Sequence, residues 1–209
     1  MQPGYTRYCC FLCEWDSRAR QSHYIVKEWP LQYQLTAGVK SVSCQSLVYL
    51  EKILLPPLHI KLGLMKNFVK AIVNYNKEEE DFKYLKDKFP KVNDAKIKEG
   101  VFIGPQIREQ FKDLNFEACL NSVEKAPWNS FKSLNENFLG TKKSPIYEEL
   151  VVTLLDAFRT MGCNMSLKIQ FLHSHLQFFP ENLGAVSDEL GERFHQDMST
   201  MKVLSKHDG

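Results

Sequence analysis

The chain has 209 residues, of which 44% are hydrophobic and 25% charged, and its 27 basic and 25 acidic side chains give a formal net charge of +2. This composition excludes a wholly disordered chain, and the length allows one substantial core, or one core with an appendage. The net charge is too small to indicate nucleic-acid binding by itself.

The first 20 residues are polar, aromatic and cysteine-containing, and they lack the apolar stretch and cleavage site of a signal peptide. The longest apolar runs, such as residues 53–58, are far shorter than the ~20 residues that a membrane span needs. We therefore expect an intracellular protein without a membrane partner, whose six cysteines are reduced. Cys44, Cys119 and Cys163 are expected to be buried as small hydrophobic residues.

The N-terminal segment, residues 1–57, lacks a regular hydrophobic period. It is aromatic and turn-rich up to residue 30, and a connector rich in Ser and Gln then runs to Pro56-Pro57, where a helix is barred. Residues 58–209 are expected to form a second, helical unit.

Apolar residues at three- and four-residue steps predict the helices of this second unit. The first carries its stripe from Leu58 to Val73, and further helices are expected over residues 78–89, 107–120 and 128–139. Ser144 as N-cap and Pro145 at the first helical position predict the start of the clearest helix, which Gly162 can end.

Residues 165–179 fit two patterns. Apolar residues recur at helical spacing over the whole segment, but those from Met165 to Phe171 also alternate as in a strand, and we favour a helix. A last helix is expected from its cap at Ser187 to Met201. The predicted fold class is therefore predominantly α.

Cys10 and Cys13 have the spacing at which two thiolates bind one zinc ion from a tight turn. Unliganded cysteines are the alternative, and a redox pair is disfavoured because no βαβ pattern surrounds them. For the remaining ligands, His23 could close a local site, whereas His173 and His175 form the densest imidazole pair. Residues two apart on a regular helix project about 200° from each other, so both histidines can bind one ion only from a strand or a distorted helix end.

Two further groups of charged residues suggest a function. Asp188, Glu192 and His195 share one face of the last predicted helix, which is typical of a capped helix with ion pairs but also of a carboxylate that binds Mg²⁺ for phosphoryl transfer. The first predicted helix carries three lysines without a nearby acid, Lys61, Lys66 and Lys70. They are candidates for phosphate contacts, and the alternative is that they form a solubilising surface.

Several strings resemble a family of uncharacterised, transposon-derived invertebrate proteins. They are Cys10–Arg18, Leu55–Ala71, Gly162–Lys168, Phe171–Leu176, Phe179–Asp188 and Gly191–Asp197. More distantly, the order of motifs resembles DDE-type transposases with an RNase H-like core, of the Transib and antigen-receptor recombinase type. In that pattern a CxxC follows the second catalytic Asp, a helical insertion and zinc-binding histidines come next, and the third catalytic acid lies on a final helix.

The resemblance implies a structural Zn²⁺ held by four residues and one vestigial catalytic acid, Glu192. The four implied ligands are Cys10, Cys13, His173 and His175. The first two catalytic Asp residues should precede the CxxC, but none of the nine residues before Cys10 is acidic. The resemblance therefore implies a helical insertion-type domain that lacks most of the RNase H-like sheet, with Mg²⁺ bound only in a full-length ancestor.

We therefore expect a transposase-derived, catalytically incomplete protein that is not an enzyme. It retains residual DNA binding, through the three lysines of the first helix, and would be nuclear under that interpretation. The alternative is a zinc-stabilised protein-interaction module without a DNA role. A third possibility is that the gene model is cut short and the real protein is a full transposase.

Overall fold

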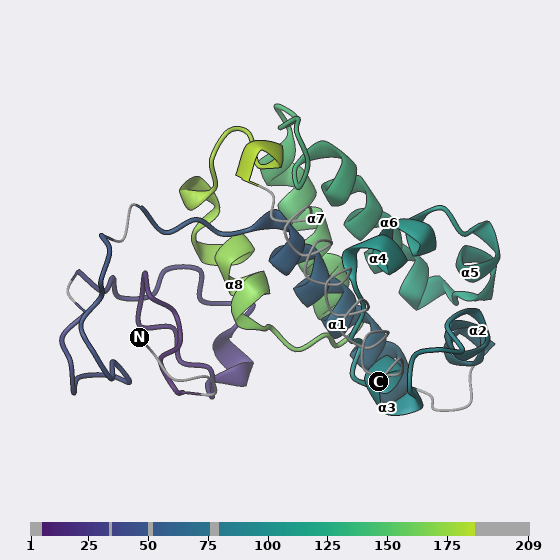
Figure 1. Ribbon diagram of the computed structural model, residues 1–209, viewed down its shortest axis with the longest axis horizontal. Helices are drawn as coiled ribbons and strands as arrows, with labels where there is room; N and C mark the ends of the chain where they lie inside the picture. The colour runs from purple at the N-terminus through teal and green to yellow at the C-terminus, as the bar shows by residue number, and fades with distance from the viewer. Residues whose placement is uncertain (1–5, 34, 50–51, 76–79, 187–209) are drawn as a thin grey trace, which may run out of the picture.

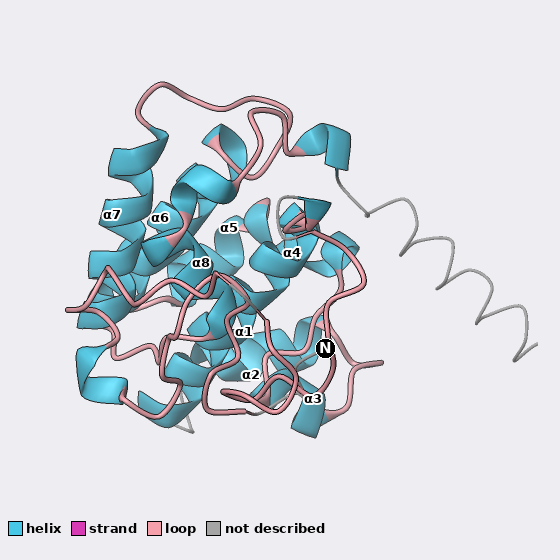
Figure 2. Ribbon diagram, turned by 90° about the vertical axis from the view of Figure 1, so that its left-hand side faces the viewer, coloured by secondary structure: helices cyan, strands magenta, loops and turns pink. Residues whose placement is uncertain are grey.

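The computed structural model describes residues 6–33, 35–49, 52–75 and 80–186. The predicted last helix, with Glu192, lies outside these residues. Within them the chain is predominantly helical, as the sequence predicts, and the extended pairing consists of two isolated β-bridges in the N-terminal segment (Figures 1 and 2).

Helices follow one another from Pro57 to Ser174. They are α1 (Pro57–Tyr75), α2 (Glu80–Lys88), α3 (Asp94–Lys98), α4 (Gly104–Phe111), α5 (Leu114–Cys119), α6 (Ser122–Asn137), α7 (Tyr147–Thr160) and α8 (Leu167–Ser174). Short 3₁₀ helices also lie outside this run, among them η1 (Arg20–Ser22), η3 (Leu176–Phe178) and η4 (Gly184–Val186). None of the helices described has the length and apolar character to cross a membrane.

Helix α1 lies at the centre and contacts α3, α4, α6 and α8 (Figure 1). Its predicted apolar stripe is confirmed, because Met65, Phe68, Val69 and Ile72 are fully buried. The helix begins one residue earlier than predicted, at Pro57. Proline is tolerated there because the first N–H groups of a helix have no partner within it.

The aromatic core is arranged around Trp128 of α6, which is fully buried. Its ring centroid lies 5.3 Å from that of Phe68 in α1 and 5.0 Å from that of Phe116 in α5. These separations are typical of tilted and edge-to-face aromatic pairs. The indole N–H donates to Glu117 Oε1 at 3.3 Å, so the buried donor is satisfied. One side chain therefore joins three helices.

The prediction of a single helix over residues 107–120 is wrong, because the chain breaks between α4 and α5. Asp113 accepts hydrogen bonds from the backbone N–H groups of Asn115 (3.0 Å) and Phe116 (3.3 Å), which makes it the N-cap of α5. The same carboxylate accepts a bond from the Tyr84 hydroxyl at 2.8 Å and pairs with Lys88 of α2. Capping and contact with α2 together restart the helix at this point.

The prediction that a helix begins at residue 128 is also wrong, since α6 begins at Ser122. Asn121 Oδ1 accepts from the N–H groups of Val123 (2.9 Å) and Glu124 (3.1 Å), and Glu124 Oε2 accepts from the Asn121 N–H at 2.9 Å. This reciprocal capping box fixes the start. Pro127 therefore lies inside the helix rather than before it.

Helix α7 packs along α6 and begins at Tyr147, two residues after the proline that was expected to open it. Its end is as predicted. Gly162 has a φ of +78°, and its N–H donates to Arg159 O at 3.0 Å, while the Cys163 N–H donates to Phe158 O at 2.9 Å. This pair of bonds is a Schellman motif, which satisfies carbonyls at the helix end.

The segment 165–179 is helical, as favoured, but it is divided into α8 and the short η3. Helix α8 approaches α1 closely, because a Cβ placed on Gly63 would lie 2.5 Å from Lys168 Cδ. Asn67 Nδ2 donates to Ser166 Oγ at 2.8 Å across the same contact. In Figures 1 and 2 the loops of the N-terminal segment lie against the other side of α8.

Candidate metal centre

A loop of the N-terminal segment presents Cys10 and Cys13. An isolated bridge pairs Tyr8 with Asp16 at the base of the loop, and a second pairs Cys13 with Leu31. The second bridge is supported by two backbone bonds, from the Glu14 N–H to Pro30 O at 2.8 Å and from the Gln32 N–H to Leu12 O at 3.0 Å. Both cysteines are fully buried.

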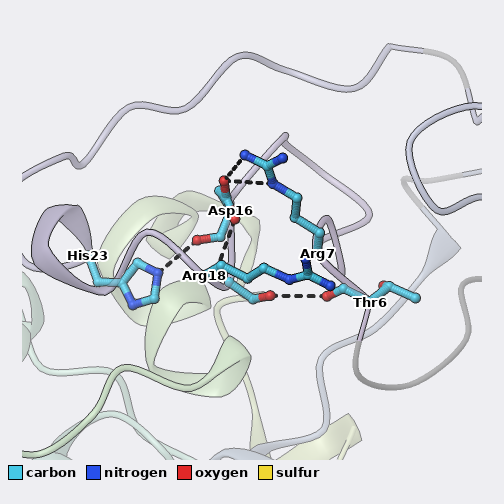
Figure 3. Close-up of polar contacts among 6 residues, drawn as sticks. Thr6, Arg7, Asp16, Arg18 and His23 are labelled. Carbon is cyan, nitrogen blue, oxygen red and sulfur yellow. Dashed lines mark hydrogen bonds and ion pairs between the residues drawn. The ribbon is translucent and has the colours of Figure 1, made fainter.

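Asp16 organises the base of this loop (Figure 3). The Arg7 guanidinium donates to Asp16 Oδ2 from Nε at 2.9 Å and from Nη2 at 2.6 Å, and the Arg18 N–H donates to Oδ1 at 3.0 Å. The Arg7 bond holds the pKa of the Asp16 carboxyl below its usual value. Ser17 Oγ donates to Thr6 O at 3.1 Å, which closes the loop on its other side.

His175 meets the two cysteines from the end of α8. Its Nε2 lies 3.1 Å from Cys13 Sγ and 3.6 Å from Cys10 Sγ. All three ligand atoms lie within 4.8 Å of one another, and all three residues are buried. His175 has left helical geometry, with φ −134° and ψ 36°, so its ring is carried by a distorted helix end.

The thiols of the pair differ in acidity. The pKa of Cys13 is lowered, first because it accepts a hydrogen bond from Cys10 and second because it contacts the His175 imidazole. The pKa of Cys10 is raised by the same bond and by burial. The Cys13 thiolate is thus favoured over its thiol. A bound cation would also favour the thiolate of Cys10, because metals bind deprotonated cysteine.

The donor set and its spacing fit a tetrahedral ion. Zinc binds thiolate sulfur at about 2.3 Å and imidazole nitrogen at about 2.0–2.1 Å, so sulfur and nitrogen ligands lie roughly 3.6 Å apart. The separations from His175 Nε2 to the two sulfurs, 3.1 and 3.6 Å, are close to this value. Thiolate and imidazole together favour zinc over magnesium or calcium.

Gln170, one turn into α8, completes the surroundings. Its side chain is fully buried, and its Nε2 donates to Cys13 Sγ at 3.4 Å. Its Oε1 is buried and has no hydrogen-bond partner. A buried acceptor left unpaired typically costs about 1–3 kcal/mol. Sequence analysis missed this residue because glutamine is rarely a metal ligand.

The structure does not place His173 with Cys10, Cys13 and His175. The prediction that His173 and His175 bind the same ion is therefore wrong. His173 lines a separate cavity of about 280 Å³, together with Tyr24 and Lys27. Its Nδ1 is buried without a partner, and burial with the nearby Lys27 lowers its pKa. His173 lies in the last turn of α8 and His175 just past its end, and the two side chains enter different surroundings.

His23, the alternative local ligand, is also placed elsewhere. Its Nε2 donates to the Asp16 carbonyl at 2.8 Å (Figure 3), and its ring packs on Trp15 with centroids 4.7 Å apart. This buried histidine therefore supports the loop base and does not approach the cysteines.

Two of the three lysines predicted to contact DNA are paired within the fold. Lys70 Nζ lies 2.7 Å and Lys66 Nζ 3.9 Å from Glu99 Oε2, so an acid that follows α3 offsets the charges that seem unopposed along the sequence. Such exposed pairs contribute only about 0–1 kcal/mol. Lys61 lies half-buried on α1.

The remaining cysteines follow the prediction only in part. All six are described, and none of them forms a disulfide. Cys163 is buried, which raises its pKa to about 12. Cys44 is exposed and Cys119 half-buried, so the expectation that they are buried is wrong. Cys44 lies in the connector, which has little core to enter.

A large cavity of about 1130 Å³ lies between the N-terminal segment and the loop before α8. Three basic side chains line it, Arg18, Arg20 and Lys168, and none of the described residues that line it is acidic. Arg18 and Arg20 lie far from Lys168 in the sequence, so no cluster of basic residues in the sequence could have indicated this site.

Two family models match parts of the chain. A domain of unknown function (DUF8703) matches residues 1–48, and another domain of unknown function (DUF8704) matches residues 57–140. No curated protein and no solved structure matches the chain. The first match contains both cysteines of the candidate metal centre, whereas His175 lies beyond the second.

Proposed function

We propose that Cys10, Cys13 and His175 hold a structural zinc ion that fastens the N-terminal segment to α8. The observation that supports this proposal is the convergence of two buried thiols and one buried imidazole at ligand spacing. Zinc with two thiolates and a neutral imidazole has no net charge. Such a complex avoids the large cost of an unpaired buried charge.

The ion would lie between the N-terminal segment and the helical body. Cys10, Cys13 and Trp15 are buried in the same core cluster as the helices, and further contacts join the two parts. The Tyr24 hydroxyl donates to Cys163 O at 2.9 Å, and the Phe11 ring lies 5.4 Å from Phe171. A zinc ion bound from both sides would add a further link between these two parts of the chain. The protein would then be a metal-stabilised module.

Metal analysis of the purified chain tests this proposal. We expect about one zinc per chain, lost on substitution Cys13→Ser, and a thermal unfolding midpoint that falls when zinc is chelated. Cys163→Ser is the matched control, since Cys163 is buried away from the group. Zinc well below one per wild-type chain, or full zinc retention in Cys13→Ser, would contradict the proposal.

Residual DNA binding is a second candidate function, supported by the cationic lining of the large cavity. Arg18, Arg20 and Lys168 can contact a polyanion there without competition from acids among the described lining residues. This surface replaces Lys66 and Lys70, which pair with Glu99, as the better candidate. An origin from a transposase remains a prediction from the sequence resemblance.

Salt-dependent binding to random duplex DNA tests the second candidate. We expect weak binding at low salt that weakens further in Arg18→Glu/Arg20→Glu, with Lys66→Glu/Lys70→Glu much less affected. Fluorescence anisotropy of a labelled duplex gives the affinities. No binding at low salt, or equal losses in the two double variants, would count against the cavity as the DNA site.

A further inference from the structure

We infer that the amide oxygen of Gln170 is the fourth ligand of the metal centre, which would then take two thiolates, one imidazole and one amide oxygen. This inference rests on the proposed zinc centre and extends it. Tetrahedral zinc requires four donors, and the group of buried Cys and His residues among those described supplies three. The fourth must come from another side chain or from water.

Burial singles out Gln170. Its side chain has no exposed surface, and its Oε1 has no hydrogen-bond partner, although its Nε2 contacts Cys13. Buried carbonyl oxygens in folded proteins almost always have a partner. An ion between the sulfur atoms would provide one. The unpaired oxygen and the incomplete ligand set therefore explain each other.

The position of the amide fits. Gln170 Nε2 lies 3.4 Å from Cys13 Sγ, close to the roughly 3.6 Å that separates a sulfur from a nitrogen or oxygen ligand on tetrahedral zinc. The amide has oxygen and nitrogen in nearly equivalent places, and a half-turn about its terminal bond exchanges them. That rotation would place Oε1 at the ligand position and Nε2 where Oε1 now lies.

Charge also favours this ligand over the nearest alternative. Zinc with Cys10, Cys13, His175 and an amide is neutral, as a buried complex should be. A third thiolate from Cys9 would leave one net negative charge. Cys9 is only half-buried, and it lies outside the group of converging ligand atoms. Gln170 thus completes the coordination without introducing a charge that the interior would have to stabilise.

Cobalt substitution tests the inference, because the visible spectrum of Co²⁺ reports its ligands. We compare the wild-type chain with Gln170→Ala and Gln170→His, each checked for helical content by circular dichroism. Added imidazole probes whether the fourth position is open. We expect the wild-type spectrum to be insensitive to imidazole, since Gln170 occupies that position. In Gln170→Ala the position would pass to water, and imidazole would shift the spectrum.

Zinc affinity separates a ligand from a residue that only donates a hydrogen bond to Cys13. A ligand at this position predicts zinc binding on the order of tenfold tighter or more in Gln170→His, because imidazole binds zinc and keeps the buried complex neutral. A role limited to hydrogen bonding predicts no gain in zinc affinity in Gln170→His, since a side chain in that role does not contact the ion.

Three results would overturn the inference. They are a wild-type cobalt spectrum that responds to imidazole, a Gln170→Ala spectrum that does not, and zinc binding in folded Gln170→His that is no tighter than in the wild type. Each can occur with one metal ion bound per wild-type chain, in which case the proposed zinc centre survives. If the wild-type chain binds neither zinc nor cobalt, the proposed function fails and this inference fails with it.

Discussion

His175 Nε2 lies 3.1 Å from Cys13 Sγ, although 162 residues separate them in the sequence. The contact joins a loop of the N-terminal segment to the end of α8, and both side chains are buried. A buried thiol with a lowered pKa beside an imidazole indicates a metal ligand or a reactive cysteine. Cys10 presents a second buried sulfur 3.6 Å from the same imidazole nitrogen, and this favours a metal over a reactive cysteine.

Substituting the two histidines of α8 one at a time should distinguish their roles. We expect His175→Ala to lose the bound metal and the stability that it confers, which is about 4 kcal/mol when free zinc is roughly 1,000 times its dissociation constant. His173→Ala, two residues away, should keep one metal per chain because His173 lines another cavity. Metal analysis and thermal unfolding of both variants check this. Metal loss in His173→Ala would show that both histidines bind the ion.

Gly100 should tolerate no side chain. It has a φ of +64°, and a Cβ there would lie 2.6 Å from Lys66 Cα, in the backbone of α1. Gly100→Ala therefore combines a left-handed penalty of about 1–2 kcal/mol with an overpacking cost of about 1–3 kcal/mol.

Gly162→Ala is the matched control for Gly100→Ala. Gly162 has a similar φ of +78°, but a Cβ there would meet nothing within 4 Å. It should show the conformational penalty alone. Chemical denaturation gives both free energies of unfolding, and equal losses in the two variants would mean that Gly100 does not approach α1 as closely as described.

The sequence predicts a helix correctly where apolar residues recur every three or four positions, as in α1, because all of these residues then lie on one buried face. It fails where a single capping side chain decides the outcome. Asp113 starts α5 inside the segment predicted as one helix, and Asn121 starts α6 ahead of the predicted helix. Both act through hydrogen bonds to backbone N–H groups, which the spacing of apolar residues does not reveal.

The sequence indicated what kind of residues form the candidate metal centre, but not all of its members. The CxxC spacing indicates two ligands, and the histidine segment indicates more. Which histidine contributes depends on where α8 ends and which side it turns to the N-terminal segment. Gln170 gave no sequence signal, since its importance comes from an unpaired oxygen in the folded state.

Asp113 should contribute a pH-dependent part of the stability. Despite its burial, bonds from Lys88 and Tyr84 hold its pKa below the usual value. A carboxyl with a depressed pKa in the folded state stabilises the protein fully above its unfolded pKa of about 3.9, and that contribution disappears as the pH falls through the folded value. We expect the loss to begin below about pH 5.

Two variants separate the cap from the ion pair. Asp113→Ala should lose about 1 kcal/mol for the N-cap of α5, in addition to the pair with Lys88. Asp113→Asn keeps a good cap and should lose only about 0–1 kcal/mol. Denaturant unfolding at neutral and acidic pH measures both. The difference between wild type and Asp113→Asn should shrink at acidic pH, and a constant difference would exclude this role.

The chain by itself should neither cut nor join DNA. Two-metal phosphoryl transfer needs several converging carboxylates, and Glu192, the one candidate acid of the resemblance, cannot supply them alone. A nuclease assay with Mn²⁺ on supercoiled DNA should give no cleavage above background, and Glu192→Ala should behave identically. Cleavage abolished by Glu192→Ala would reverse this conclusion.

The separation of 165 residues between Cys10 and His175 has a consequence for folding kinetics. Contacts between distant parts of a chain form late, because the intervening chain must be ordered first. Interactions absent from the folding transition state leave the folding rate unchanged and slow unfolding. An ion held across this contact would therefore lengthen the lifetime of the folded protein without hastening its formation.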